Sequence, residues 1–220
     1  MLFHRAGGGV GRPQQRRGPV DRDRIAASAY LEAELGNTGA AKHAAMSALQ
    51  LDSGQYVTIS AALTLAQVGD TARAKELVAQ FEKHGASNAM SELVALPLVK
   101  AAIQVNSGDP AQAVATSEVT LPYELAAQLI PAYLRGRIQL SAHNGTAAVI
   151  EFQKLLDHPG VVLNDPIGAL AHFQLGRAYV MTGDTTKALA AYKEFLTLWK
   201  DADPDIPVLK EAKAEYAKLQ

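Results

Sequence analysis

The sequence predicts an all-α protein, specifically a right-handed α-solenoid of about five helix pairs followed by a C-terminal capping helix. A signature recurs along the chain, with a glycine, then Asp or Asn, and an alanine five residues after the glycine. The first two of these glycines are 33 residues apart and the next gap is 39 residues, which is typical of arrays of helix–turn–helix repeats. The 220 residues are also rich in helix-favouring alanine and poor in aromatic residues.

Each residue type in the signature has a physical role. Glycine adopts the left-handed conformation that ends a helix, Asp or Asn caps the next helix, and a small alanine lets two helices approach closely. The signature pairs are Gly36 with Ala41, Gly69 with Ala74, Gly108 with Ala113, and Gly183 with Ala188. A weaker copy has His143 in the glycine position and Ala148 in the alanine position.

The chain divides into a leader, residues 1–24, and a helical array, residues 25–220. The leader is rich in Gly and Arg, contains six arginines and two aspartates, and has almost no apolar residue to bury, so we expect it to be disordered. It could serve as a nucleic-acid arm, but no aromatic residue lies between its arginines to stack on bases. The favoured interpretation is a solvated or cloning-derived leader.

Within the array, residues 165–200 contain small and aromatic residues at regular spacing, namely Gly176, Tyr179, Gly183, Ala188 and Tyr192. With this spacing the segment resembles a tetratricopeptide repeat (TPR). The preceding unit, residues 129–160, has Gly136, Ala148 and Phe152 in the corresponding positions.

The units before residue 129 keep the turn signature, but they have Leu65, Val78 and Ala45 where the resemblance would place aromatic residues. At the other end, the chain after Pro204 contains an amphipathic segment, residues 207–219, rich in Lys and Glu. We expect this segment to form the polar cap that the last unit of a solenoid needs.

A closer resemblance covers roughly residues 25–220 and is most specific from about residue 150 onward, most clearly in Leu175-Gly176-Arg177-Ala178-Tyr179 and in the run from Phe195 to Pro207. This segment resembles the C-terminal TPR region of bacterial, acidobacterial-type, eukaryotic-like serine/threonine protein kinases, and similar regions follow winged-helix regulators. The resemblance implies an interaction scaffold that binds a peptide or partner surface in a concave groove, in bacterial signalling. The alternative is a detached regulatory module of such a kinase or regulator, without activity of its own.

The sequence offers no support for an enzyme. It has no cysteine, no kinase motif, and six histidines that lack the spacing of a metal-ligand pair, so we expect no catalysis, cofactor or metal. His158 and His172 are interpreted as surface hydrogen-bonding residues, with a metal or proton-transfer pair as the less favoured alternative. No apolar run approaches the roughly 20 residues that span a bilayer, and the N-terminus lacks a secretory core, so we expect a cytoplasmic protein.

The candidate partner-binding residues come from the register of the last two units. Tyr133 and Phe173 fall at the fifth position of the first helix, and Arg137 and Arg177 fall at the ninth. An aromatic residue followed one helical turn later by an arginine would present repeated donors to the carboxylates or phosphates of a protein or peptide partner. The alternative is that each arginine pairs with a glutamate of this chain. No small-molecule substrate is expected.

Overall fold

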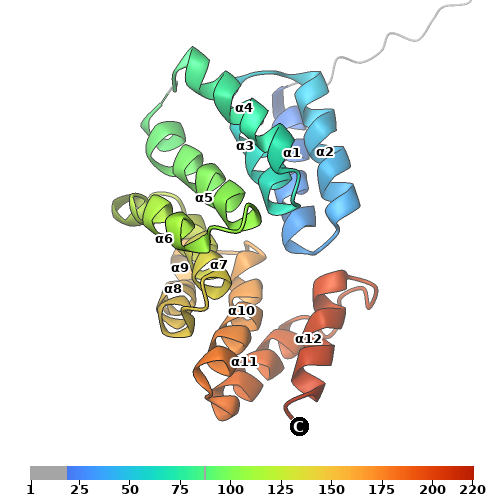
Figure 1. Ribbon diagram of the computed structural model, residues 1–220. Helices are drawn as coiled ribbons and strands as arrows, with labels where there is room; N and C mark the ends of the chain where they lie inside the picture. The colour runs from blue at the N-terminus through green and yellow to red at the C-terminus, as the bar shows by residue number, and fades with distance from the viewer. Residues whose placement is uncertain (1–18, 87) are drawn as a thin grey trace, which may run out of the picture.

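The computed structural model describes residues 19–86 and 88–220, and every regular element within these residues is a helix (Figure 1). The all-α prediction is therefore confirmed for the described chain. The α-helices are α1 (Pro19–Glu34), α2 (Thr38–Leu51), α3 (Gln55–Gln67), α4 (Thr71–His84), α5 (Leu96–Asn106), α6 (Pro110–Glu118), α7 (Ile130–Ser141), α8 (Gly145–Asp157), α9 (Pro159–Val162), α10 (Ile167–Thr182), α11 (Thr185–Leu198) and α12 (Pro207–Ala217). A π-helical turn, η1 (Ser91–Ala95), leads into α5, and a 3-10 turn, η2 (Leu121–Tyr123), follows α6.

Consecutive helices pack as pairs, and the pairs pack on one another. The pairs are α1 with α2, α3 with α4, α5 with α6, α7 with α8, and α10 with α11. The first helices of successive pairs also contact each other, α1 with α3, α3 with α5, α5 with α7 and α7 with α10. Figure 1 shows this stacking from α1 and α2 in blue to α10 and α11 in orange, with α12 in red at the end.

The connection within each pair has one backbone geometry. The residue that ends the first helix has a positive φ, as expected from the signature glycines: 83° at Gly36, 83° at Gly69, 85° at Gly108 and 80° at Gly183. His143 takes the same role with a φ of 58°. In all five connections the N–H of the next residue donates to a carbonyl oxygen five residues earlier, at 2.8 to 2.9 Å, which satisfies the end of the first helix.

The Asp and Asn residues of these connections make different hydrogen bonds. The carboxylates of Asp70, Asp109 and Asp184 accept the N–H three residues later and so cap the second helix, as expected. The two asparagines make no such cap, so that part of the prediction is wrong. Instead, the amide of Asn37 donates to Glu32 at 2.8 Å, and the amide of Asn144 donates to Gln139 at 2.9 Å. Both amides therefore bond to a side chain of the preceding helix and leave the following helix without a side-chain cap.

Close helix contacts occur where the sequence places small residues. All five signature alanines are fully buried. A Cβ added to Gly136 would lie 2.6 Å from the ring of Phe152, and one added to Gly176 would lie 2.8 Å from the ring of Tyr192. Tyr179 is half-buried against the same core, with the ammonium of Lys187 5.5 Å from its ring centroid.

The core changes in character along the chain. Around α3 and α4 it is built from alanine and aliphatic residues, including Leu65 and Val78, with Phe81 as its aromatic residue. From α7 onward, aromatic rings dominate, and Phe173 stacks on Phe195 at 5.4 Å between centroids. Larger side chains from the second helix require smaller residues on the first, which explains why Gly136 and Gly176 occur only in this half.

The first pair and the last helix meet. The backbone N–H of Val208, at the start of α12, donates to the carbonyl of Leu35 at 3.1 Å, just after the end of α1. Val208, Leu209 and Ala212 are buried, so α12 covers the core as a capping helix should. Its bounds, Pro207–Ala217, are close to the expected 207–219.

The predicted leader is described only in part. Residues 1–18 lie outside the described residues, and residues 19–24, which the sequence analysis included in the leader, form the beginning of α1. A proline such as Pro19 is compatible with a first helical turn, where its missing N–H removes no helix hydrogen bond. Among the described helices, none is long and apolar enough to cross a membrane.

Candidate functional site

The four predicted partner-binding residues lie on two first helices, α7 and α10. The rings of Tyr133 and Phe173 are fully buried in the core, so they offer no surface to a partner. The side chains of Arg137 and Arg177 remain 35% and 33% exposed. Of the predicted set, only the arginines therefore reach solvent.

Arg137 belongs to a buried network centred on Glu34, at the end of α1. Its Nη1 donates to Glu34 Oε1 at 2.6 Å, and the Tyr133 hydroxyl donates to Oε2 at 2.9 Å. Gln67 of α3 donates its amide to Oε1 at 2.7 Å. The Glu34 side chain is only 1% exposed, so these three donors replace the water that its carboxylate lost on burial. The network joins α1, α3 and α7.

Electrostatics in this network hold Arg137 and Tyr133 each in one protonation state. The Glu34 carboxylate raises the pKa of the Arg137 guanidinium above its already high ordinary value. Burial, and then the negative charge of Glu34, raise the pKa of the Tyr133 hydroxyl. Tyr133 therefore stays a neutral donor and Arg137 stays a cation, which is the arrangement that a buried carboxylate requires.

Arg177 belongs to a second network, formed with α12. Its Nε donates to both oxygens of Glu215 at 3.1 Å, and its Nη2 donates to Glu215 at 2.6 Å and to Glu211 at 2.8 Å. The Tyr192 hydroxyl donates to Glu215 at 2.8 Å. The guanidinium also lies over the Phe173 ring, 4.1 Å from its centroid, as in a cation–π contact.

The glutamates of the second network are more exposed to solvent than Glu34 in the first. Glu215 is 28% exposed and Glu211 is 54% exposed. Partial burial raises the pKa of Glu215, but the hydrogen bonds and charge of Arg177, with the Tyr192 hydroxyl, outweigh it, so the pKa lies below its ordinary value. Burial and the bond to Glu215 raise the pKa of the Tyr192 hydroxyl, which stays a neutral donor.

Both arginines therefore pair with glutamates of the same chain. Arginines at equivalent positions of adjacent pairs therefore bind glutamates of different helices, Arg137 at the end of α1 and Arg177 on α12. These contacts therefore do not form a row of free donors for an extended ligand. The prediction that the arginines contact a partner is untested by these contacts, because both retain exposed surface.

A third arginine, which the sequence analysis missed, lies on another face of α7. Arg135 is 2% exposed and donates twice to Glu151 of α8, at 3.1 and 2.8 Å, and once to Thr120 at 2.8 Å. It also pairs with Glu124 in the segment that precedes α7. No register signal marks an arginine whose partners lie on a neighbouring helix and an irregular connection. The cluster is internal and fastens the α6–α7 segment.

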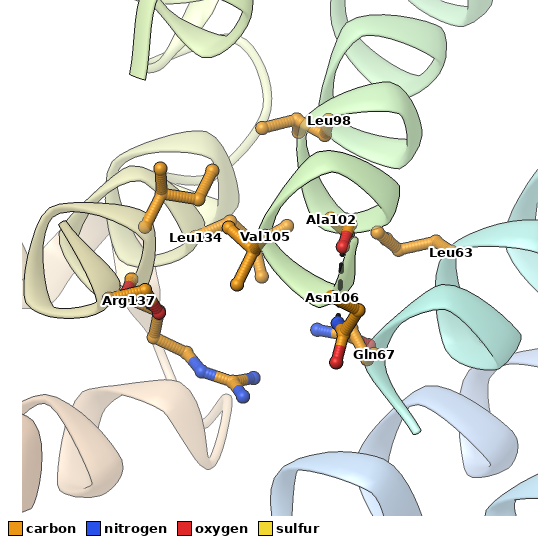
Figure 2. Close-up of a pocket in the computed structure, with 10 residues that line it drawn as sticks. Leu63, Gln67, Leu98, Ala102, Val105, Asn106, Leu134 and Arg137 are labelled. Carbon is orange, nitrogen blue, oxygen red and sulfur yellow. Dashed lines mark hydrogen bonds between the residues drawn. The ribbon is translucent and has the colours of Figure 1, made fainter. Parts of the chain in front are cut away.

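Two cavities flank the Glu34 network. The smaller, about 70 Å³, lies between α3, α5 and α7 and is lined by Gln67, Asn106 and Arg137 (Figure 2). It has room for a few waters and no more. The larger, about 530 Å³, lies between α1, α3, the start of α7 and the connection before α10. A volume in this range is typical of ligand sites.

His158 and His172, the histidine pair considered from the sequence, have different local contacts. A ring nitrogen of His158 lies 2.8 Å from the carbonyl oxygen of Lys154, which agrees with a local helix-end contact. His172 is half-buried on α10, and its burial lowers the pKa of the imidazole. Within residues 19–86 and 88–220, no group of three or more acidic or histidine side chains is arranged to hold a metal ion.

Comparison with known proteins adds no assignment. No protein-family model matches the sequence, and no match is found among curated proteins.

Proposed function

We propose that this protein is a non-catalytic interaction scaffold, built as a right-handed α-solenoid of TPR-like helix pairs. The observation that carries the proposal is the fivefold recurrence of one connection, with a positive φ, a hydrogen bond back to the preceding helix and a fully buried alanine five residues later. Repetition of one local unit is the construction principle of solenoids, whose main use is to present an extended surface to protein partners.

The partner in this proposal is a protein or peptide, and it binds on the concave side formed by the first helices of the pairs. The larger cavity supports this choice because it opens between first helices, α1, α3 and α7. The resemblance of the chain to kinase-associated TPR regions, which is most specific from about residue 150 onward, supports a role in bacterial signalling, in the cytoplasm. The proposal includes no cofactor and no nucleic acid.

Arg177 is the member of the predicted set best suited to contact a partner. Its carboxylate partners on α12 are themselves partly exposed, so an acidic partner can approach the same guanidinium from solvent. Arg137 is less suited, since its charge neutralises the buried Glu34. Tyr133 and Phe173 contribute by positioning the arginines.

The experiment begins with affinity capture on the full chain, followed by mass spectrometry to identify the partner. Calorimetry at fixed salt then compares the parent with Arg177→Ala, and we expect about tenfold weaker binding for loss of a charged hydrogen bond. Arg73→Ala is the matched control, because Arg73 is an exposed arginine on the second helix α4. Equal affinities for parent and Arg177→Ala would remove Arg177 from the interface.

The alternative, a detached regulatory module of a serine/threonine kinase or winged-helix regulator, is favoured by the same resemblance. The two proposals differ in the partner. The scaffold would bind a separate protein, whereas the module would act on a catalytic or DNA-binding domain encoded next to it. The genomic sequence upstream distinguishes the two. A kinase or winged-helix reading frame next to this one supports the module, and its absence leaves the independent scaffold.

A further inference from the structure

The larger cavity, of about 530 Å³, has a largely apolar wall that is open to solvent. Its lining includes Leu63 of α3 and Ile130 of α7, and Tyr56 of α3 remains 55% exposed beside them. Arg24 and Asp165 contribute one charge of each sign to the wall. An open apolar hollow of this size can bury apolar side chains of a ligand or of another segment of chain.

One wall of this cavity is the helix that directly follows residues 1–18. Arg24, Ala27, Ser28 and Leu31 of α1 line the cavity and lie on one face of the helix. Because they come five to twelve residues after Pro19, this wall extends from about 8 to about 18 Å along the helix axis from its first residue. Residues 1–18 therefore join the described chain close to the cavity.

The sequence of residues 1–18 combines an apolar start with a glycine-rich connection of suitable length. Met1, Leu2 and Phe3 are consecutive large apolar residues, whereas residues 4–18 contain five glycines and only Val10 as a comparable side chain. A glycine-rich chain as long as residues 4–18 has an r.m.s. span of about 20 Å and a maximum of about 50 Å. The average span matches the distance along α1. Such a match gives the highest effective concentration of one site at the other, on the order of 1 mM.

The distribution of charge favours the same contact. Residues 1–18 contain four arginines and no acidic residue. All 22 Asp and Glu residues of the protein lie after residue 18, where they outnumber the Lys and Arg residues. The two parts of the chain therefore attract each other, and Asp165 places a carboxylate in the cavity wall itself.

We propose that Met1, Leu2 and Phe3, which we call the head, occupy the larger cavity of the same chain, with residues 4–18 as the connection. The head buries its apolar side chains against the wall around Tyr56 and Leu63. A second copy of the chain would need a concentration near 1 mM to compete with a head that is already attached. A partner that uses this cavity must displace the head, so the head regulates access to it. The contact goes beyond the proposed function and can be tested without a partner.

The first test uses a spin label, because the chain has no cysteine and His4→Cys therefore accepts a single nitroxide next to the head. In the ¹⁵N-labelled full chain, we expect this label to broaden the amide signals of Tyr56, Ser60 and Ile130, which line the cavity. The matched control is the same labelled chain with Leu2→Asp/Phe3→Asp, in which the broadening should be lost. Absent broadening, or equal broadening in both proteins, would overturn the proposal.

A mixed sample tests whether the contact forms within one chain. It contains ¹⁵N-labelled chain without a nitroxide and nitroxide-labelled chain without ¹⁵N. We expect its amide signals to stay sharp. Broadening in this sample would assign the cavity to the head of a second copy and would overturn the contact within one chain.

A synthetic peptide of residues 1–8 measures the competition. It should bind Leu2→Asp/Phe3→Asp with saturable shifts of the cavity amides. If its Kd is about 0.1 mM, it should bind the parent about tenfold more weakly, because the attached head competes at about 1 mM. Equal binding to both proteins would overturn the proposal.

A change in the cavity wall should act in the same way. Added to the Leu2→Asp/Phe3→Asp chain, Tyr56→Ala should weaken the peptide, since it removes an exposed ring from the wall. Leu51→Ala is the matched control, because Leu51 is 45% exposed on α2 and is not among the lining residues of the cavity. Equal effects of the two would overturn the assignment to this cavity. If a captured partner binds but the spin label broadens no cavity amide, the scaffold stands and the head contact does not.

Discussion

The pair α7/α8 and the pair α10/α11 place the same residue types at the same positions, yet those residues meet different surroundings. Arg137 holds a glutamate that is 1% exposed, whereas Arg177 holds one that is 28% exposed. Both arginines are about one third exposed themselves. The position in the repeat therefore places each arginine on a first helix, but the burial of its glutamate partner decides how much the arginine contributes to the stability of the fold.

The physical reason is the cost of leaving a charge without water or a counter-ion. If Arg137 is removed, Glu34 keeps two neutral donors, Tyr133 and Gln67, but no positive charge. If Arg177 is removed, Glu215 can be rehydrated, as a surface carboxylate is. The following predictions test this contrast, starting with the largest expected effect.

Arg137→Ala should destabilise the protein by about 3–5 kcal/mol, because it leaves the buried Glu34 carboxylate unpaired. Urea unfolding measured by circular dichroism at pH 7 gives the difference in free energy. The double variant Glu34→Gln/Arg137→Met is the control, since it removes both charges together and should lose much less. A midpoint for Arg137→Ala equal to that of the parent would mean that Glu34 is hydrated and the contrast with Arg177 does not hold.

Gly136→Ala and Gly176→Ala should each cost about 1–3 kcal/mol, because the new methyl group overlaps the ring of Phe152 or Tyr192. The two should differ in a second respect. Moving Tyr192 also disturbs its bond to Glu215, so Gly176→Ala should loosen α12, which hydrogen exchange of α12 amides measures. Gly39→Ala is the control, since nothing lies within 4 Å of its added Cβ. Equal stability of Gly176→Ala and Gly39→Ala would contradict the close contact.

The helix pairs could be predicted from sequence because their signals are local. A glycine that ends a helix, the acid after it and an alanine five residues later lie within six consecutive residues, so the local chain fixes their geometry. Even there, Asn37 and Asn144 bond backward to Glu32 and Gln139, a choice that depends on a side chain five residues away. His143 shows that the backbone geometry persists without glycine.

For each contact in the candidate site, the sequence could predict the arginine but not the residue that it binds. The register placed Arg137 and Arg177 on the inner helices and suggested that they bind carboxylates. It could not supply the partner of Arg137, because Glu34 lies 103 residues away and meets it only through the packing of three helix pairs. The hydroxyl of Tyr30, which is buried without a hydrogen-bond partner, could not be predicted for a similar reason, since the burial of one atom depends on the whole fold.

Asp184→Ala should lower the melting temperature, whereas Asn144→Ala should leave it nearly unchanged. These residues occupy the same position of the two pairs, but only Asp184 caps the following helix, by accepting the N–H of Lys187 at 3.1 Å. The decrease should be smaller than for the glycine variants. Asp184→Ser, which can still accept that hydrogen bond, should restore most of the difference. Equal melting of the two alanine variants would show that the caps are equivalent.

The smallest expected effect is that of Arg177→Ala, at about 1 kcal/mol or less at pH 7, because the pair it breaks is partly hydrated. The effect should depend on pH with a definite sign. The folded pKa of Glu215 lies below its ordinary value of 4.5, so the pair stabilises the protein above that value and loses its contribution as the pH falls through the folded pKa. Parent and Arg177→Ala should therefore converge in acid.

Chemical denaturation of both proteins at several pH values between 7 and 3 measures this convergence. Glu215→Gln serves as the control, since a neutral side chain at this position should abolish the pH dependence of the Arg177→Ala difference. A difference that persists unchanged to pH 3 would mean that Arg177 stabilises the protein through its contact with the Phe173 ring, because that contact does not titrate. In that case α12 would be held by apolar packing, and its glutamates would be free to be replaced by those of a partner.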